Sequence, residues 1–104
     1  MGTLPYMAPE LAEGARAAGA PADVFAFALI ACELLTGESA FDVPPVLVAR
    51  KLPAPRALPS SVPASISATL MECLRADPAA RPTARVVDDV LASASRSRRT
   101  GAWP

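Results

Sequence analysis

The 104-residue sequence predicts an all-α fold of about five helices, with no β-sheet. Strand signals are poor, because apolar and polar residues do not alternate clearly with period 2 and no Asn-Gly hairpin turn occurs. The run Val24–Leu35, interrupted only by Glu33, is apolar all around a wheel of 3.6 residues per turn, which is typical of a buried helix. Twelve prolines divide the chain into short helices and turns, since proline fixes φ and has no amide donor.

The first part of the chain predicts two loops separated by one helical turn. Gly2 and Pro5 oppose helix formation in residues 1–8. Pro9 suits the first turn of a short helix, where a missing amide has no cost, and residues 10–13 complete that turn. Residues 14–21 are small and flexible, which favours a loop.

The central helix is expected to begin near Asp23, whose carboxylate can accept unpaired amide N–H groups and complement the helix dipole. Gly37 is the expected C-cap, because glycine adopts the left-handed conformation freely. A helix that is apolar all round must be surrounded by other structure.

The second half predicts a short segment after Pro44-Pro45, an irregular connector over residues 53–63 and two more helices. The helix Ser65–Arg75 is amphipathic and ends before Asp77-Pro78. Thr83 is the expected N-cap of the last helix. The buried positions expected in these two helices are Ile66, Leu70, Met71, Leu74, Val86, Val87, Val90 and Leu91. The Ser/Arg-rich residues 93–104 predict a disordered tail.

Composition argues against several classes of function. Ten basic and ten acidic residues give zero net charge, so neither a nucleic acid nor a membrane surface is expected as a partner. Cys32 and Cys73, without any histidine, are too few for a zinc site and are expected to be small buried apolar residues, although a disulfide stays open. The sequence shows no signal peptide and no apolar run of about 20 residues, which predicts a cytoplasmic protein.

Three motifs occur in order along the chain, and the first is Gly-Thr-Leu-Pro-Tyr-Met-Ala-Pro-Glu at residues 2–10. The motifs resemble the serine/threonine protein kinase family, in its bacterial type, and this first one is similar to the end of the activation segment. Residues 23–37 resemble the central buried helix, with Phe25 where the family usually has Trp and Ala28 where it usually has Gly. Asp77-Pro78 and Arg81-Pro82-Thr83 resemble the loop before the last helix. The resemblance implies a partial kinase domain over residues 1–92, namely the helical C-terminal lobe without the N-lobe sheet.

The resemblance also implies roles for individual residues. Glu10 and Arg81 would form a buried ion pair, against the simpler interpretation that both are surface charges. Asp23 would accept backbone amides of the catalytic loop, with or without acting as an N-cap. Gly2, Thr3 and Tyr6 would belong to the substrate-facing loop. The Gly-Thr pair favours the serine/threonine branch over the tyrosine branch, and packing is the expected role of Tyr6.

No catalytic, cofactor-binding or metal-binding residue is assigned. Phosphoryl transfer in this family uses a Gly-rich loop, a nucleotide lysine and carboxylates on Mg²⁺. The sequence has no Gly-x-Gly-x-x-Gly, no Asn and no His, and its one lysine is Lys51. The parent family uses ATP and Mg²⁺ to phosphorylate protein serine and threonine, but we expect these 104 residues to be inactive by themselves.

Three interpretations remain open at this level. The sequence could come from a truncated or mis-assigned kinase gene. It could form a non-catalytic binding module that docks a partner kinase or a protein substrate. The third possibility is that the chain is an unrelated small helical protein. In the first two cases we expect Phe25, Phe27, Leu29 and Ile30 to be partly bare, and the chain to be marginally stable and prone to self-association.

Overall fold

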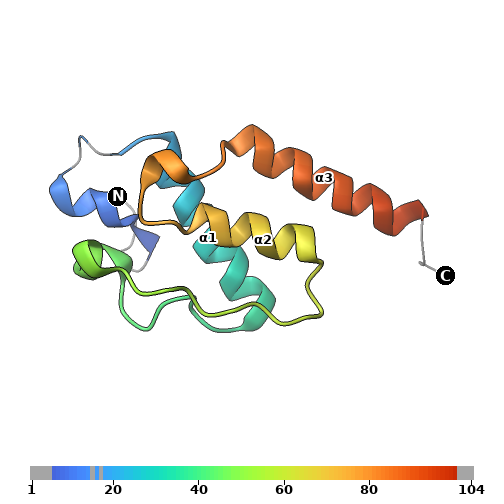
Figure 1. Cartoon of the computed structure of the whole chain (residues 1–104), viewed down its shortest axis with the longest axis horizontal. Coiled ribbons are helices and arrows are strands. Elements are labelled where there is room, and N and C mark those ends of the chain that lie inside the picture. Colours follow the sequence, from blue (N-terminus) through green and yellow to red (C-terminus); the bar gives the residue numbers. More distant parts are fainter. Residues whose placement is uncertain (1–5, 15, 17, 101–104) are drawn as a thin grey trace.

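The structure is a computed structural model that describes residues 6–14, 16 and 18–100 (Figure 1). Within those residues every regular element is helical, which confirms the all-α prediction. Three α-helices and three 3₁₀ helices are present in the described part, against about five helices expected. In chain order these are η2 (Pro9–Glu13), α1 (Ala20–Thr36), η4 (Pro45–Lys51), α2 (Ala64–Cys73), η5 (Pro78–Ala80) and α3 (Ala84–Thr100).

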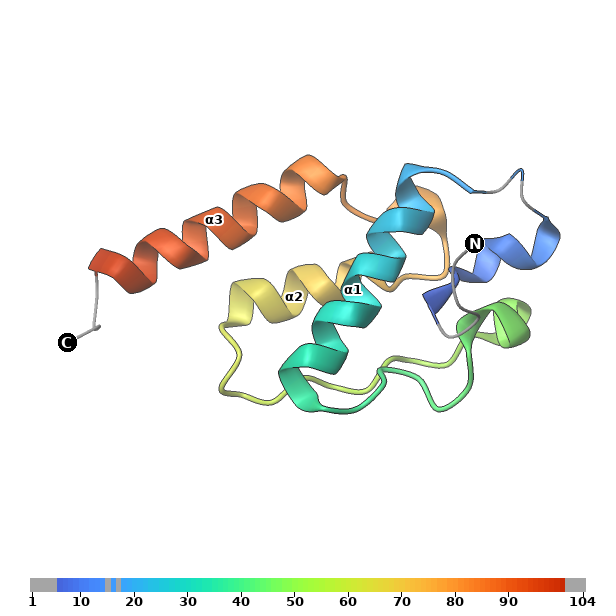
Figure 2. The ribbon, with the colours of Figure 1, turned by 180° about the vertical axis from the view of Figure 1, so that it is seen from behind.

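Helix α1 is the centre of the arrangement (Figures 1 and 2). Helix α2 packs against α1, and α3 packs against α2 before extending away from the body. The short helices η2 and η4 pack against each other at the opposite end. None of the described helices is both long and apolar enough to cross a membrane.

Helix α1 begins earlier than the sequence predicted. It starts at Ala20 with Gly19 as the N-cap, and Pro21 occupies its first turn, where proline is well tolerated. Asp23 already lies within that turn, with its amide N–H donating to the Gly19 carbonyl at 3.1 Å, and no side chain caps the helix. The N-cap prediction for Asp23 is therefore wrong, and residues 20–21 belong to the helix rather than to the loop. Gly37 ends α1 as expected, at φ 77°.

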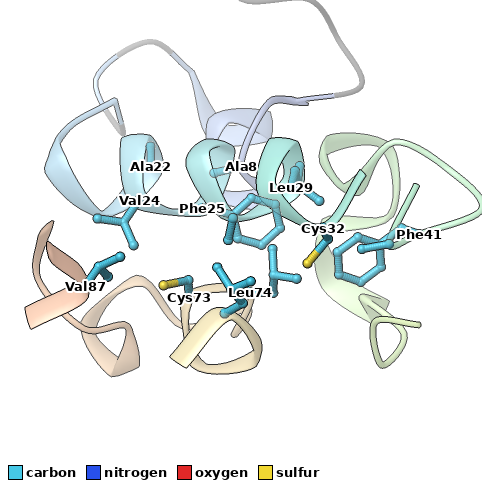
Figure 3. Close-up of a cluster of buried hydrophobic side chains, with 13 residues drawn as sticks. Ala8, Ala22, Val24, Phe25, Leu29, Cys32, Phe41, Cys73, Leu74 and Val87 are labelled. Carbon is cyan, nitrogen blue, oxygen red and sulfur yellow. The ribbon is translucent and has the colours of Figure 1, made fainter. Parts of the chain in front are cut away.

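The core lies on one side of α1 (Figure 3). Phe25 is fully buried and stacks on Phe41 at 6.1 Å between ring centroids, and Leu29 is 3% exposed. The expectation that these two α1 side chains would be bare is therefore wrong, because residues 40–41 and α2 cover this side of the helix. Phe27 and Ile30 point elsewhere and are 43% and 46% exposed, as expected.

Helices α2 and α3 follow the sequence pattern in most respects. Leu70 and Leu74 are buried, and Ile66 and Met71 pack partly buried against the core. The Thr83 hydroxyl accepts the N–H of Val86 at 3.3 Å, which is the expected N-cap bond.

Two expectations for α3 are wrong. Val86 was expected in the buried side of the helix but is 47% exposed, whereas Val87 is buried. Residues 93–100, predicted as part of a disordered tail, continue the helix to Thr100. The stretch 84–100 contains neither proline nor glycine and is rich in alanine and arginine, which favour helix. Residues 101–104 lie outside the described residues.

Candidate functional site

Arg81 and Glu10 form an ion pair with two parallel hydrogen bonds. Arg81 Nη1 donates to Glu10 Oε2 and Nη2 donates to Glu10 Oε1, both at 2.8 Å. The Arg81 side chain is fully buried and the Glu10 side chain is 13% exposed. The structure thus brings together the two residues for which the sequence indicated a pair. The planar fork of a guanidinium matches the two oxygens of a carboxylate, which fixes the orientation of both groups.

The remaining Arg81 donors are all used by backbone carbonyls. Nε donates to the Arg75 oxygen at 2.8 Å, Nη1 also donates to the Pro21 oxygen at 2.9 Å, and Nη2 to the Ala76 oxygen at 3.3 Å. A guanidinium has five N–H donors, so every one has an acceptor. One side chain therefore links η2, the start of α1 and the segment after α2.

Two further contacts hold this arginine in place. Its guanidinium carbon lies 4.7 Å from the centre of the Phe25 ring, in a cation–π geometry. Asp77 caps η5 by accepting the Ala79 N–H at 3.0 Å, which shapes the turn that leads to Arg81. The carbonyl acceptors could not be predicted from the sequence, because every residue has a backbone oxygen and the residue type does not show which oxygen accepts.

Tyr6 makes a second long-range contact. Its hydroxyl donates to Glu33 Oε1 at 2.8 Å, across 27 positions of sequence. The hydrogen bond to Glu33 and the negative charge of that carboxylate raise the pKa of Tyr6 above its usual value of 10.0. Sequence reasoning assigned packing to Tyr6 and missed Glu33 as its partner. The available signal was a lone carboxylate inside the otherwise apolar run Val24–Leu35.

Residues 6–10 are therefore attached at both ends to the same helix. Tyr6 is bound to Glu33, near the C-terminal end of α1, and Glu10 is bound through Arg81 to the Pro21 carbonyl at its N-terminal end. Between these attachments Ala8 and Pro9 are buried. The segment is held on the platform that α1 provides, in a direction opposite to that of the helix.

Asp23 is exposed beside a groove of about 380 Å³ between α1 and α3. Gly2 and Thr3, the other residues of the predicted substrate-facing loop, lie outside the described residues.

Cys32 and Cys73 are buried free thiols, and burial is the main cause that raises the pKa of each, to about 11 for Cys73.

The acidic and basic side chains of the described residues determine whether a metal ion or ATP could be held. They contain no group of three or more His, Cys, Asp or Glu that could hold a metal. The α1/α3 groove has two carboxylates in its lining and no cation, so it would repel a triphosphate. Lys51 and Arg56 line another hollow, but Arg56 is bound to Asp42 in an ion pair.

The described residues thus form an all-helical body in which a buried arginine binds the glutamate of an Ala-Pro-Glu segment. The family model described as "Protein kinase domain" matches residues 1–91 of this chain. The chain belongs to the protein kinase domain family. No curated protein matches the sequence.

Proposed function

We propose that this chain is the helical C-terminal-lobe portion of a serine/threonine protein kinase of bacterial type, whose parent activity is ATP-dependent phosphoryl transfer to protein serine or threonine. In this proposal the 104 residues present the end of the activation segment to a protein substrate. By themselves they do not transfer phosphate, because the groups that bind nucleotide and Mg²⁺ are not among them.

The buried pair between Glu10 and Arg81 is the observation that carries this proposal. It joins the Ala-Pro-Glu motif to the Arg-Pro-Thr motif, and all five donors of the arginine are satisfied. An ion pair on the surface would hardly restrain the elements that it joins. This buried pair holds η2 against the start of α1 and the segment after α2. Such an anchor gives residues 6–10 a defined position, from which the segment could meet a substrate.

The remaining residues have roles in the same proposal. Gly2, Thr3 and Tyr6 would form the loop that meets the substrate, and the Gly-Thr pair supports serine/threonine rather than tyrosine specificity. Asp23 would accept backbone amides of the catalytic loop in a whole domain, and its exposed position beside a groove supports that role. Zero net charge favours protein partners over nucleic acid or a membrane surface, and a cytoplasmic location belongs to the same proposal.

A chimeric kinase tests the proposal. The upstream part of an active bacterial serine/threonine kinase, ending just before its Gly-Thr pair, is joined to residues 2–104 of this chain. We expect the chimera to transfer phosphate from ATP to serine and threonine of a general protein substrate, and Arg81→Met to abolish transfer. The matched control is Glu13→Gln, an exposed carboxylate at the other end of η2, which should leave activity unchanged.

Two results would contradict the proposal. One is a chimera that folds and binds ATP but is inactive, or that phosphorylates tyrosine instead. The other is phosphate transfer, or binding of a fluorescent ATP analogue, by the 104-residue chain by itself.

A non-catalytic protein-binding module is the second candidate function. Phe27, Ile30 and Leu34 follow one another at helical spacing on α1 and are 43%, 46% and 82% exposed. An apolar strip of this kind is typical of an interaction surface. Its partner in this proposal is a protein, such as a kinase or a kinase substrate.

A further inference from the structure

The connector between η4 and α2 contains an extended run, residues 52–59, that belongs to no helix, strand or turn. Pro53, Pro55 and Pro59 fix φ at about −65°, and each proline biases the residue before it towards extended backbone. Leu52, which begins the run, has φ −62° and ψ 120°. Together these constraints favour polyproline II, a left-handed helix with about three residues per turn and no internal hydrogen bonds.

The burial of this run repeats every third residue. Leu52, Pro55 and Leu58 are partly buried, and the two leucines pack against the hydrophobic core. The residues between them are exposed and form two ridges, since residues three apart lie on one side of a polyproline II helix. One ridge is Pro53, Arg56 and Pro59, and the other is Ala54 and Ala57.

The middle of the run is fixed to the segment that follows α1. The Arg56 amide N–H donates to the Ala40 carbonyl at 2.8 Å, and its Nε donates to the Ser39 carbonyl at 3.2 Å. The Arg56 guanidinium also pairs with Asp42. The connector and the segment after α1 lie side by side in both ribbon views (Figures 1 and 2). Because the run is held extended before any partner binds, ordering it on association costs little.

The exposed side of the run is apolar, with an unpaired cation at its start. Residues 51–59 contain no aspartate or glutamate. Lys51 is exposed and lines a hollow of about 390 Å³ together with Pro53 and Ala54. Among the described residues Lys51 makes no ion pair, whereas Arg56 is already paired with Asp42. A polyproline II ridge beside a free cation is complementary to a groove that is lined by aromatic rings and has carboxylates at one end.

We propose that residues 51–59 are a docking segment for a partner protein domain with such an aromatic, acidic groove. The exposed prolines and alanines would lie against the rings, and Lys51 would pair with the carboxylates. Leu52 and Leu58 would stay packed on the core, so the chain does not have to unfold to bind. This docking role does not rest on the proposed kinase function, because it uses neither residues 2–10 nor phosphate transfer.

Titration of the full 104-residue chain with purified SH3 domains tests this proposal, because SH3 domains bind polyproline II in aromatic-lined grooves. The probes are a set of SH3 domains that bind proline-rich peptides with a basic residue at one end. The control is the same set with the groove carboxylates changed to amides. In isothermal titration calorimetry we expect at least one unmodified domain to bind, and a proline-rich peptide ligand of that domain to displace the chain. Its affinity should fall as NaCl rises from about 0.05 to about 0.5 M.

Variants of the chain locate the binding. Pro53→Ala together with Pro59→Ala should weaken it about tenfold, because both ring contacts and preorganisation are lost. Pro63→Ala is the matched control, since Pro63 is an exposed proline of the same connector outside the run. Lys51→Gln should weaken binding about two- to fivefold, as for an exposed ion pair, whereas Arg85→Gln on α3 should have no effect. Circular dichroism of each variant separates loss of binding from loss of fold.

Four results would overturn the docking segment. The first is failure of every SH3 domain to bind a folded chain, which would leave the chimeric kinase experiment unaffected. The second is equal affinity for the unmodified and amide-substituted domains. The third is an equal effect of each variant and its control. The fourth is self-association of the chain that the Pro53/Pro59 double variant abolishes, because the occupant would then be a second copy.

Discussion

Glu10 and Arg81 are 71 positions apart in the sequence, yet they form two parallel hydrogen bonds of 2.8 Å in the interior of the protein. The guanidinium is fully buried and has no unsatisfied donor. Burying a charge is costly unless it is paired and hydrogen-bonded, and here both conditions hold. The pair therefore contributes little net stability compared with an apolar replacement of both residues. Loss of one member alone, however, leaves the other as a buried charge without a partner.

Removing one member of this pair should be strongly destabilising. We expect Glu10→Gln and Arg81→Met each to lower the free energy of unfolding by about 3–5 kcal/mol. Arg81→Lys should not restore stability, because an ammonium has three donors and lacks the planar fork. Urea denaturation followed by circular dichroism measures the change, with Glu13→Gln as the exposed control. A stability of Arg81→Lys equal to that of the parent chain would contradict this account.

Tyr6 is the only tyrosine in the sequence, so its ionisation can be followed by absorbance at 295 nm. Because Glu33 raises its pKa, we expect a titration midpoint above 10.0, and Glu33→Gln should shift the midpoint down. The neutral phenol stabilises the folded state below the usual pKa of 10.0, and this stabilisation is lost as the pH rises through the higher folded-state pKa. A midpoint at or below 10.0 in the folded chain would count against the Tyr6–Glu33 contact.

The two cysteines should be unreactive in the folded chain. Cys32 and Cys73 are buried, and the pKa of Cys73 is raised to about 11, so little thiolate is accessible near pH 8. We expect slow reaction of both thiols with Ellman's reagent, and rapid reaction of two thiols per chain in guanidinium chloride. Rapid labelling of the folded chain at pH 8 would show that α1 and α2 separate easily.

Gly37 and Gly19 provide a matched test of backbone conformation at the two ends of α1. Gly37 has φ 77°, which is unfavourable for any residue with a Cβ, whereas Gly19 has φ 177°, an extended conformation open to all residues. Neither position is sterically crowded, so backbone conformation alone should decide the effect. We expect Gly37→Ala to cost about 1–2 kcal/mol and Gly19→Ala to be close to neutral. Thermal melts of the two variants make the comparison, and equal effects would refute the left-handed C-cap.

Exposed apolar side chains on α1 should make the chain prone to association. Leu34 is 82% exposed, and Phe27 and Ile30 are about half exposed. We expect the parent chain to bind a hydrophobic dye and to associate as its concentration rises, and Leu34→Glu to reduce both effects. Sedimentation velocity and dye fluorescence measure them. A monodisperse monomer with a sharp melt and little dye binding would contradict the prediction of marginal stability.

Local patterns determined most of the helices. Pro9 predicted the first turn of η2, Gly37 the end of α1, and Thr83 the N-cap of α3, because each acts through its own backbone geometry or through a bond to an amide a few residues away. The start of α1 was missed, because Pro21 was assigned to the preceding loop although it also suits a first helical turn. The end of α3 was missed because the Ser/Arg-rich composition outweighed the absence of any helix breaker in residues 93–100.

The sequence by itself also determined the family, because three motifs occur in the right order along the chain and the kinase family model covers them. Only the tertiary structure decided which side of α1 is buried, since an apolar run has no preferred face and Phe25 and Phe27 look alike in sequence. It likewise decided what Arg81, Tyr6 and Asp23 meet. Arg81 donates to backbone carbonyls as well as to Glu10, Tyr6 donates to Glu33, and Asp23 lies beside a groove whose other wall is α3. Only long-range packing brings such groups together.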